Sequence, residues 1–390
     1  MERFDVAIVG AGPAGSSAAI SLARKGYSVI LLERAIFPRE KLCGDFLNPA
    51  NWPLLERLGV VGEILSLEHE KVTAFRISTF SGAEAAISFP SRNGRTLFGL
   101  GLRRSSLDDL LLRSAQREGV QVKQGCKVGS LAKEVGGWSL SLGDQSPGES
   151  VSSTFLIGAD GRNSWVAHRL GLALPGKADK YVAFQTHLRG ARGVKGSVQI
   201  HCFPGGYAGL VGLGGESANL CFVVENSNTT KKGISLEALL ENHLYKNISL
   251  RESLKGSEIV GKVRSTYPVH LPPRRSYGDG YLLVGDAARV TEPVTGEGVY
   301  FALRSGILAA EVMDRAFKRG NGSAEQLACY SRLCQKAFSF RQRVNRIIGA
   351  LVYRPFLLAP FLRLSSTTSF PLRPLVDRLC GASGFVKQGL

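Results

Sequence analysis

The sequence predicts an α/β protein with a parallel sheet, an inserted antiparallel sheet and a helical C-terminal region. Three observations support this fold class. Apolar runs of strand length end in glycine-bearing turns near residues 10, 158 and 285; strand-like alternation recurs in 72–89 and 181–224; and long helical periodicity begins near residue 298. The 390 residues, 44% hydrophobic and 21% charged, are typical of a globular chain. At about 150 residues per domain, two to three domains are expected.

The first motif joins an apolar strand, Val6–Val9, to a helix through a glycine-rich turn. Its residues are Gly10, Ala11, Gly12, Pro13, Ala14 and Gly15. In such a turn the first glycine permits the bend, the second leaves room for a pyrophosphate, and the third lets helix and strand pack closely. A second apolar run ends at Glu33, which is placed to bind a ribose diol. The pattern predicts a Rossmann-type dinucleotide-binding unit and leaves FAD and NAD open.

Two further apolar strands stop at sharp polar turns, one at Asp160-Gly161 and one at Gly285-Asp286. Shortly afterwards the sequence Pro293-Val294-Thr295-Gly296-Glu297-Gly298-Val299 opens a long amphipathic helix. Ligands of open α/β sheets bind outside the carboxyl ends of the strands, and the amino end of a helix attracts negative charge. We therefore expect all these turns to face one ligand.

Together these motifs resemble the FAD-dependent oxidoreductases of the p-hydroxybenzoate hydroxylase structural class, over about residues 4–315. Within that class the geranylgeranyl reductase family is nearest, and flavin-dependent halogenases form a neighbouring branch. The resemblance implies a Rossmann-type FAD-binding domain with an inserted antiparallel β-sheet substrate domain. The expected boundaries are 1–70, 98–175 and 270–318 for the discontinuous FAD-binding domain, 71–97 and 176–269 for the substrate-binding sheet, and 319–390 for the helical basic C-terminal region.

The resemblance also implies which residues bind FAD. They are Gly10, Gly12, Pro13, Ala14, Gly15, Glu33, Arg34, Cys43, Gly44, Arg104, Asp160, Gly161, Gly285, Asp286, Pro293, Gly296, Glu297, Gly298 and Val299. A second dinucleotide turn is not evident, so NADH or NADPH is expected to dock transiently at the same flavin, and an external reduced donor would serve equally well. The cysteine spacing matches no metal-binding pattern.

Three residues are candidates for proton transfer: Cys43, Asp45 and His201. The loop 37–49 resembles the PxxKxCGG stretch of geranylgeranyl reductases, where the cysteine lies by the flavin, but Asp45 replaces the second glycine. The alternatives are a buried inert thiol for Cys43, a solvated loop position for Asp45 and a hydrogen-bonded or exposed strand position for His201. Ile200 to Pro204 matches the reductase pattern on the inserted sheet except for its tryptophan, which indicates a different substrate.

These observations predict an FAD-dependent enzyme that reduces carbon–carbon double bonds of a hydrophobic isoprenoid, lipid or polyketide. One alternative is a flavin-dependent monooxygenase or halogenase acting on an aromatic or polyketide substrate. The halogenase WxWxIP pattern is absent, and Arg289 replaces the histidine of the GDAAH sequence of aromatic hydroxylases. A second alternative is a non-enzymatic prenyl-group carrier on the same fold.

The charge balance favours an anionic partner, since 49 Lys and Arg oppose 32 Asp and Glu. Residues 341–390 combine eight basic residues and one Asp with many apolar ones, which is typical of contact with an anionic membrane surface. The alternative is a helix pair packed on the protein with a solvated basic face. No nucleic-acid module is recognised. The seven cysteines are odd in number and no signal peptide is visible, so we expect a cytoplasmic, membrane-associated protein.

Overall fold

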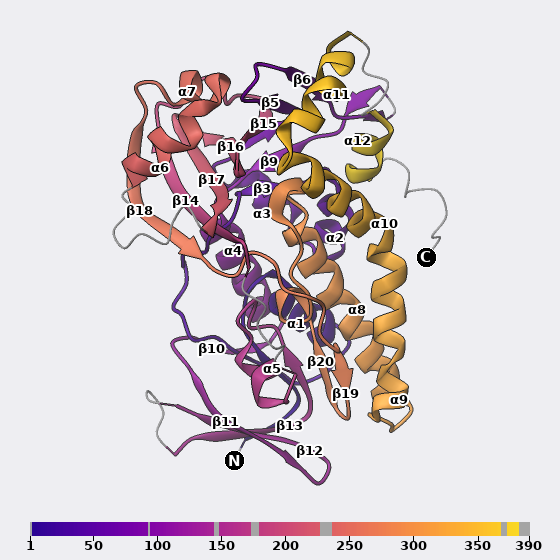
Figure 1. The fold of residues 1–390 in the computed structure, drawn as a ribbon. Helices are drawn as coiled ribbons and strands as arrows, with labels where there is room; N and C mark the ends of the chain where they lie inside the picture. Colours follow the sequence, from indigo (N-terminus) through magenta and orange to yellow (C-terminus); the bar gives the residue numbers. More distant parts are fainter. Residues whose placement is uncertain are drawn as a thin grey trace.

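The computed structural model describes residues 2–92, 94–143, 148–172, 179–226, 236–367 and 373–381. One half of the molecule, the lower half in Figure 1, is organised around a parallel sheet with β1 in its middle. Its strands, in spatial order, are β10 (Gln121–Lys123), β2 (Val29–Leu32), β1 (Glu2–Val9), β13 (Ser150–Gly158) and β20 (Tyr281–Leu283). The central strands are buried apolar runs because both faces of the sheet are covered.

Beyond β13 the sheet also carries antiparallel strands. β12 (Gly137–Leu142) pairs with the amino-terminal half of β13, β11 (Val128–Glu134) pairs with β12, and β19 (Tyr277–Gly278) pairs with β20. Since β12 and β20 use different halves of β13, both can lie on the same edge.

Helices α1 (Pro13–Ala23) and α8 (Gly298–Lys318) pack closely against each other beside this sheet. A Cβ on Gly306 of α8 would come within 2.3 Å of the Ala14 carbonyl oxygen. The Ser17 hydroxyl donates to the Leu303 carbonyl at 3.2 Å, which ties the two helices together. This contact brings the amino end of α8 close to the glycine-rich turn that precedes α1. On the other side α1 packs against α4 (Arg104–Arg117).

A second sheet forms the upper half in Figure 1. Its strands, in spatial order, are β18 (Glu258–Thr266), β14 (Tyr181–Arg189), β17 (Ser217–Glu225), β16 (Gly206–Gly214), β15 (Ser197–Phe203), β5 (Ala74–Thr79) and β6 (Glu84–Ser88). The expected hairpin between 72 and 89 is confirmed, since β5 and β6 pair around Ser81-Gly82. The sheet is antiparallel except that β15 pairs with β5 in parallel. The β5–β6 hairpin comes from an earlier part of the chain than the other strands of this sheet.

Short elements connect the two halves. A small sheet of β3 (Phe46–Leu47), β9 (Gly99–Gly101) and β4 (Glu70–Val72) lies against β16. Its strand β3 begins directly after the Cys43–Asp45 loop, so this loop is held between the two large sheets. The remaining short elements are η1 (Pro49–Asn51), α2 (Trp52–Arg57), α3 (Val61–Ser66), β7 (Ser91–Arg92), β8 (Arg95–Thr96), α5 (Trp165–Arg169), α6 (Leu236–Asn242), η3 (Leu244–Lys246), α7 (Ile248–Leu254), η4 (Gly285–Ala287) and η5 (Pro293–Thr295).

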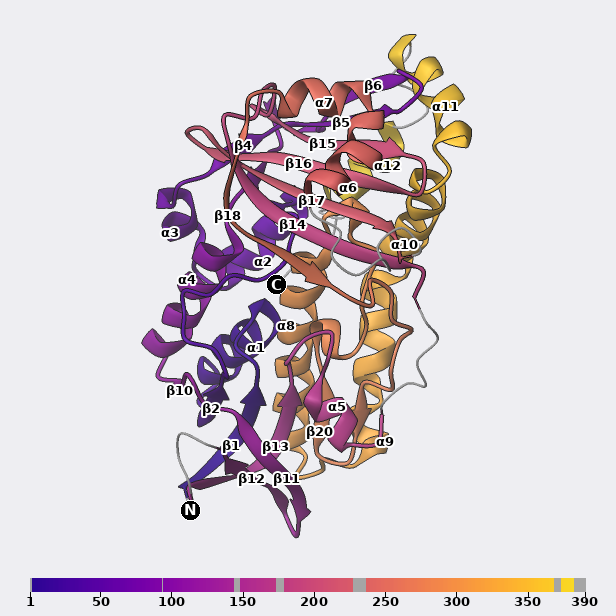
Figure 2. The same cartoon turned by 60° about the vertical axis from the view of Figure 1, so that its left-hand side comes forward.

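The C-terminal region is helical, with α9 (Ala324–Leu327), α10 (Cys329–Val352), α11 (Pro355–Thr367) and α12 (Arg373–Leu379). Helix α10 runs beside α8 from the lower to the upper half, and α11 reaches β5 and β6 (Figures 1 and 2). Among the described residues, no single helix has the length and apolar character needed to cross a membrane, although the bent pair Ala324–Val352 and Pro355–Leu364 meets that test jointly.

Candidate functional site

The register of the parallel sheet brings the predicted turns to one edge. Val9, the last residue of β1, pairs with Leu32 of β2 and with Gly158 of β13, and Gly158 pairs with Leu283 of β20. The ladder continues one step further, because the Gly10 amide donates to the Leu32 carbonyl at 2.8 Å. The segments that follow the four strands therefore leave the sheet side by side.

These segments surround a cavity of about 550 Å³. The predicted FAD residues that line it are Gly12, Pro13, Ala14, Arg34, Cys43, Gly44, Arg104, Asp160, Gly161, Gly285, Asp286, Pro293, Gly296, Gly298 and Val299. A cavity of about 450 Å³ adjoins it along Gly12, Arg34 and Asp160, and is lined in addition by Gly10 and Glu33. We refer to the first as the flavin cavity and to the second as the adenosine cavity, after the parts of FAD that the resemblance assigns to them.

The glycine-rich turn has the shape that a pyrophosphate needs. Gly10 has φ +103°, and a Cβ there would lie 2.5 Å from the Ala159 carbonyl oxygen. Gly15 is packed so closely that its Cβ would lie 1.9 Å from the Gly10 carbonyl oxygen. Beside Gly12, in contrast, the nearest atom is a guanidinium nitrogen of Arg39 at 3.6 Å. Gly12 thus leaves the cavity side of the turn open, and the residues present fit the phosphates of FAD.

Glu33 is buried at the end of β2 and is bonded to the same turn. Its Oε2 accepts from the Ala11 amide at 2.8 Å and its Oε1 accepts from the Ala35 amide at 3.0 Å. Each carboxylate oxygen keeps a further lone pair. Glu33 therefore stabilises the glycine-rich turn and also lines the adenosine cavity. Its contact with a ribose remains a prediction.

Cationic side chains gather where the two cavities join. Lys41 lines both of them. Burial lowers the pKa of Lys41, while the charge of Asp286 acts in the opposite direction. Arg104 donates from Nε to Asp108 Oδ1 and from NH2 to Oδ2, both at 2.9 Å, and Arg39 reaches the same carboxylate at 3.2 Å. Asp108 thus orients two guanidinium groups at a site suited to a diphosphate.

The Asp160 carboxylate has a mainly structural task in the turn after β13. It accepts from the Ser164 hydroxyl at 2.5 Å and from the Val166 amide at 3.0 Å, at the start of α5. Burial raises its pKa, and these hydrogen bonds oppose the effect. This arrangement holds Gly161 and Asn163 against the flavin cavity.

A buried polar network lies behind Cys43. Asp45 adopts φ +50°, a left-handed conformation in which glycine is favoured, which accounts for glycine at this place in the reductase pattern. Its Oδ2 lies 2.8 Å from His187 Nε2, and its Oδ1 accepts from the Arg104 amide at 3.1 Å. Asn219, the register partner of His187 in the sheet, donates to the Cys43 carbonyl at 3.1 Å. Asp45 is therefore not on a solvated loop.

Both acid candidates of this loop favour their neutral forms. Burial raises the pKa of the half-buried Cys43 thiol, and the nearby Arg104 offsets only part of this effect. Burial also raises the pKa of Asp45, which the His187 hydrogen bond opposes. Cys221 shares the wall of the flavin cavity, and burial raises its pKa as well. The thiol of Cys43 is thus available as a proton donor rather than as a thiolate.

The structure does not place His201 with the other candidates. It is buried in β15, where Nδ1 lies 2.7 Å from the Ser78 hydroxyl and Nε2 lies 2.9 Å from Gln199 Oε1. It lines neither the flavin cavity nor the adenosine cavity. Burial lowers its pKa to about 4, so the imidazole is neutral near pH 7. The expectation of an acid near neutral pH is therefore not met.

Glu297 also departs from the expectation, because its side chain does not line the flavin cavity. The carboxylate is fully buried and forms an ion pair with Arg341 of α10. Its neighbours Gly296 and Gly298 do line the cavity. Gly296 and Gly298 thus present backbone to the ligand, while the Glu297 carboxylate binds helix α10.

Sequence reasoning missed His187, Asn219 and Lys41. Lys41 had a signal, because it occupies the lysine position of the PxxKxC pattern. His187 and Asn219 gave no such signal, because each is one polar residue within a strand. They lie 142 and 176 positions along the sequence from Asp45 and Cys43, the residues that they contact.

The buried His201 should make the unfolding free energy depend on pH. Its pKa is 6.5 when unfolded and about 4 when folded, so the unfolded chain binds the proton more readily. The stabilisation is complete above pH 6.5 and is lost as the pH falls toward 4, by about 3 kcal/mol. Urea unfolding of wild type and His201→Gln across this range measures it, with the exposed His168→Gln as control. An identical pH dependence in wild type and His201→Gln would contradict the expectation.

Replacing Glu33 should weaken binding of the expected FAD. Glu33→Ala leaves the Ala11 and Ala35 amides without their acceptor, and a buried donor left unpaired costs about 1–3 kcal/mol. We expect the flavin-to-protein absorbance ratio of the purified variant to drop and its FAD affinity to fall at least about tenfold. Glu56→Ala, exposed on α2, is the matched control. FAD retention equal to wild type would show that Glu33 does not support the cofactor.

Comparison with known proteins identifies relatives of this chain. It is 30% identical over 327 residues to a menaquinone reductase of Mycobacterium tuberculosis, covering 80% of this chain and 77% of the relative. It is 30% identical over 348 residues to digeranylgeranylglycerophospholipid reductase 1 of Methanopyrus kandleri, covering 86% and 87%. The crystal structure of CmlS, a flavin-dependent halogenase, superposes with a TM-score of 0.76 at 25% identity; it covers 87% of this chain, which spans 63% of the halogenase chain.

A family model described as an FAD binding domain matches residues 3–339. This range contains both sheets, except for the first residue of β1, and every predicted FAD residue. The resemblance to the p-hydroxybenzoate hydroxylase class is thereby confirmed, and FAD is the cofactor. The chain belongs to the FAD-binding domain family and is an FAD-dependent oxidoreductase.

Proposed function

We propose that this enzyme reduces carbon–carbon double bonds of a hydrophobic isoprenoid, lipid or polyketide. The observation that carries the proposal is the neutral Cys43 thiol on the wall of the flavin cavity, backed by the buried Asp45–His187 pair. Two relatives named as reductases support it. We further propose NADH or NADPH as the electron donor.

Reduction of a double bond requires a hydride at one carbon and a proton at the other. Reduced FAD, when bound, supplies the hydride equivalent. Cys43 is placed to donate the proton from Sγ, because its thiol lines the cavity and is kept neutral by burial. The Arg104 charge beside Sγ stabilises the thiolate that remains. Asp45 Oδ2 and His187 Nε2 share a hydrogen bond two residues further along the loop. We propose that this proton restores the thiol.

One part of the remaining wall of the flavin cavity is apolar and would accept an apolar substrate. This part carries Leu42, Phe46, Ala183 and Val269, whereas Arg162, Arg264, Ser265 and Thr266 make another part polar. Asn219 fixes the backbone of the Cys43 loop from the second sheet. A substrate held between this sheet and the Cys43 loop would present its double bond to both the flavin and the thiol.

Oxygen chemistry is the second candidate, as in a monooxygenase or halogenase, and the likeness to CmlS favours it. The two reactions differ in their need for oxygen. A reductase forms product under anaerobic conditions with NADH or NADPH, whereas a monooxygenase or halogenase consumes one oxygen molecule per product. Mass spectrometry of products from isoprenoid and polyketide substrates, with and without oxygen, decides between them. The third interpretation, a prenyl-group carrier, does not fit membership of an oxidoreductase family.

We also propose that the enzyme contacts an anionic membrane from the cytoplasmic side. Helices α10 and α11 expose Ile347, Phe356, Phe361 and Leu364, in a region of the sequence that also carries basic residues. Such a combination favours the interface of an anionic bilayer, where a lipid-like substrate would be available.

Removing the thiol should slow turnover without releasing FAD. General acids contribute about 100-fold or more to rate, so we expect Cys43→Ala to lower kcat about 100-fold and Cys43→Ser to restore part of it. His187→Gln should lower kcat less and shift the pH profile, because only the resupply of the proton is affected. Cys329→Ala on α10 is the matched control. Undiminished kcat in Cys43→Ala, measured by anaerobic stopped-flow, would return Cys43 to a structural role.

The membrane contact predicts selective vesicle binding. Wild type should sediment with phosphatidylglycerol–phosphatidylcholine vesicles and not with phosphatidylcholine alone. Phe356→Ser with Phe361→Ser should weaken this binding at least about tenfold, since burying one such side chain contributes about 1.5–3 kcal/mol. Leu65→Ser, an exposed apolar position on α3, should bind as wild type. Equal binding by all three proteins would exclude this surface.

A further inference from the structure

A further cavity of about 500 Å³ lies between α8, α10 and the segment that leads into and out of β20. It shares Gly285 and Thr291 with the flavin cavity, so the GDAA turn separates the two. It has no role in the reaction proposed for the flavin cavity. We refer to it as the arginine cavity.

The lining of the arginine cavity is strongly cationic. It includes Arg274, Arg289, Arg343 and Arg346, and among its described lining residues there is no carboxylate. Its other polar groups are mostly hydroxyls, from serines of α8 and α10 and from Tyr330. Guanidinium groups surrounded by hydroxyls form the donor set that binds phosphate oxygens.

In the part of the chain that the structure describes, no ion pair joins the arginines of this cavity to a carboxylate, in contrast to several other buried arginines. Arg104 is paired with Asp108, and Arg341 with Glu297. Arg289, in contrast, donates to the neutral amide of Gln342. Burial lowers the pKa of Arg289, and the nearby charge of Arg346 lowers it further.

Arg274 shows the same deficiency. Its NH1 donates to the Ala287 carbonyl at 3.0 Å and its NH2 to the Arg162 carbonyl at 3.4 Å, while its buried Nε has no hydrogen-bond partner among the described residues. A buried donor without an acceptor is unfavourable, as is the approach of the like charges of Arg289 and Arg346. A bound anion would relieve both.

We propose that the arginine cavity binds the phosphate or diphosphate group of a small ligand. The inference rests on the residues of this cavity and not on the reaction assigned to the flavin cavity. Two sources share this chemistry: a nicotinamide dinucleotide, or the diphosphate or phosphate ester of another small molecule.

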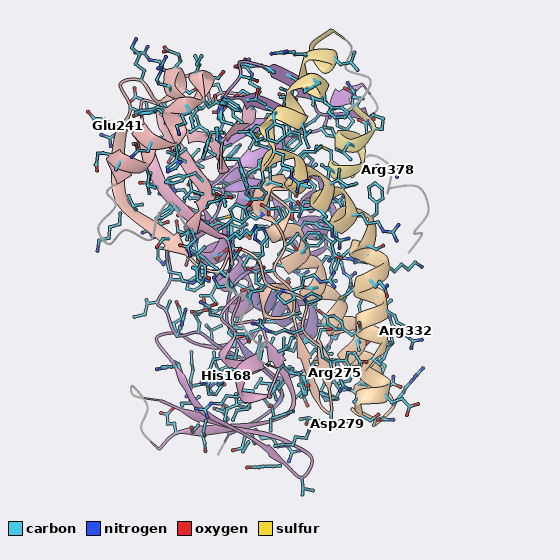
Figure 3. The ribbon with its side chains drawn as sticks, viewed as in Figure 1. His168, Glu241, Arg275, Asp279, Arg332 and Arg378 are labelled. Carbon is cyan, nitrogen blue, oxygen red and sulfur yellow. The ribbon has the colours of Figure 1, made fainter. Side chains whose placement is uncertain are left out.

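The first experiment titrates sodium pyrophosphate into the FAD-loaded full chain by calorimetry at constant ionic strength. Wild type should bind it saturably. Arg346→Gln and Arg343→Gln, two exposed residues of α10 that line the cavity, should each weaken binding about tenfold, the usual cost of losing one charged hydrogen bond. The matched control is Arg332→Gln on the same helix, whose side chain lies on the outer side of α10 in Figure 3 and does not line the cavity. It should bind within twofold of wild type.

Flavin content and thermal midpoint of each variant establish that it is folded. Absence of saturable pyrophosphate binding to wild type would overturn the proposal, and so would an equal loss in Arg332→Gln, because the effect would then be one of net charge. Since the measurement requires no turnover, a failed reductase assay leaves this result unaffected.

Competition distinguishes the two sources. If the ligand is a nicotinamide dinucleotide, NADPH or NADH displaces pyrophosphate, and Arg346→Gln weakens that dinucleotide by the same factor as pyrophosphate. If the ligand is another phosphate compound, neither dinucleotide displaces pyrophosphate while its binding still depends on Arg346. Either result supports a phosphate-binding site and identifies the class of its ligand.

Discussion

The cofactor site depends on the in-register pairing of parallel strands around β1. Val9 is aligned with the last residue of β2 and with Gly158 of β13, and Gly158 is aligned with the end of β20. Parallel strands present their carboxyl ends at one edge, so turns that are some 275 positions apart in the sequence meet there. Gly10 then needs a positive φ and Gly15 needs the absence of a side chain, because the helix must start at the point where the strand stops.

The second sheet acts on this edge through a small number of buried polar contacts. His187 and Asn219 stand opposite each other on β14 and β17, and between them they bind Asp45 and the backbone of Cys43. Such contacts are strong in a buried setting only if they are satisfied. Their effect is to place a neutral thiol on the cavity wall, which is what distinguishes this site from a simple dinucleotide-binding turn.

Helix α10 extends the site into the C-terminal region. Asn345 donates to the Glu292 carbonyl at 2.9 Å and accepts from the Thr295 hydroxyl at 3.0 Å, and Arg341 pairs with Glu297. Three contacts thus hold the Pro293–Gly298 turn, whose backbone faces the flavin cavity. The same helix presents Arg343 and Arg346 to the arginine cavity, so the region after residue 319 contributes to the architecture of both cavities.

The local pattern of the chain determined the strands, the glycine turns and the helices that follow them. Apolar periodicity and the conformational needs of glycine act over a few residues, which is why the Gly10–Gly15, Asp160 and Gly285 turns could be predicted from the local pattern. The choice of FAD came from the resemblance to a known structural class. Only the tertiary structure decided which polar side chains meet. The Asp45–His187 pair, the inward turn of Glu297 toward Arg341, the enclosed neutral His201 and the gathering of Arg274, Arg289, Arg343 and Arg346 around one cavity each depend on residues distant in sequence. Burial and charge compensation at such places are set by packing between elements, for which the sequence carries no local signature.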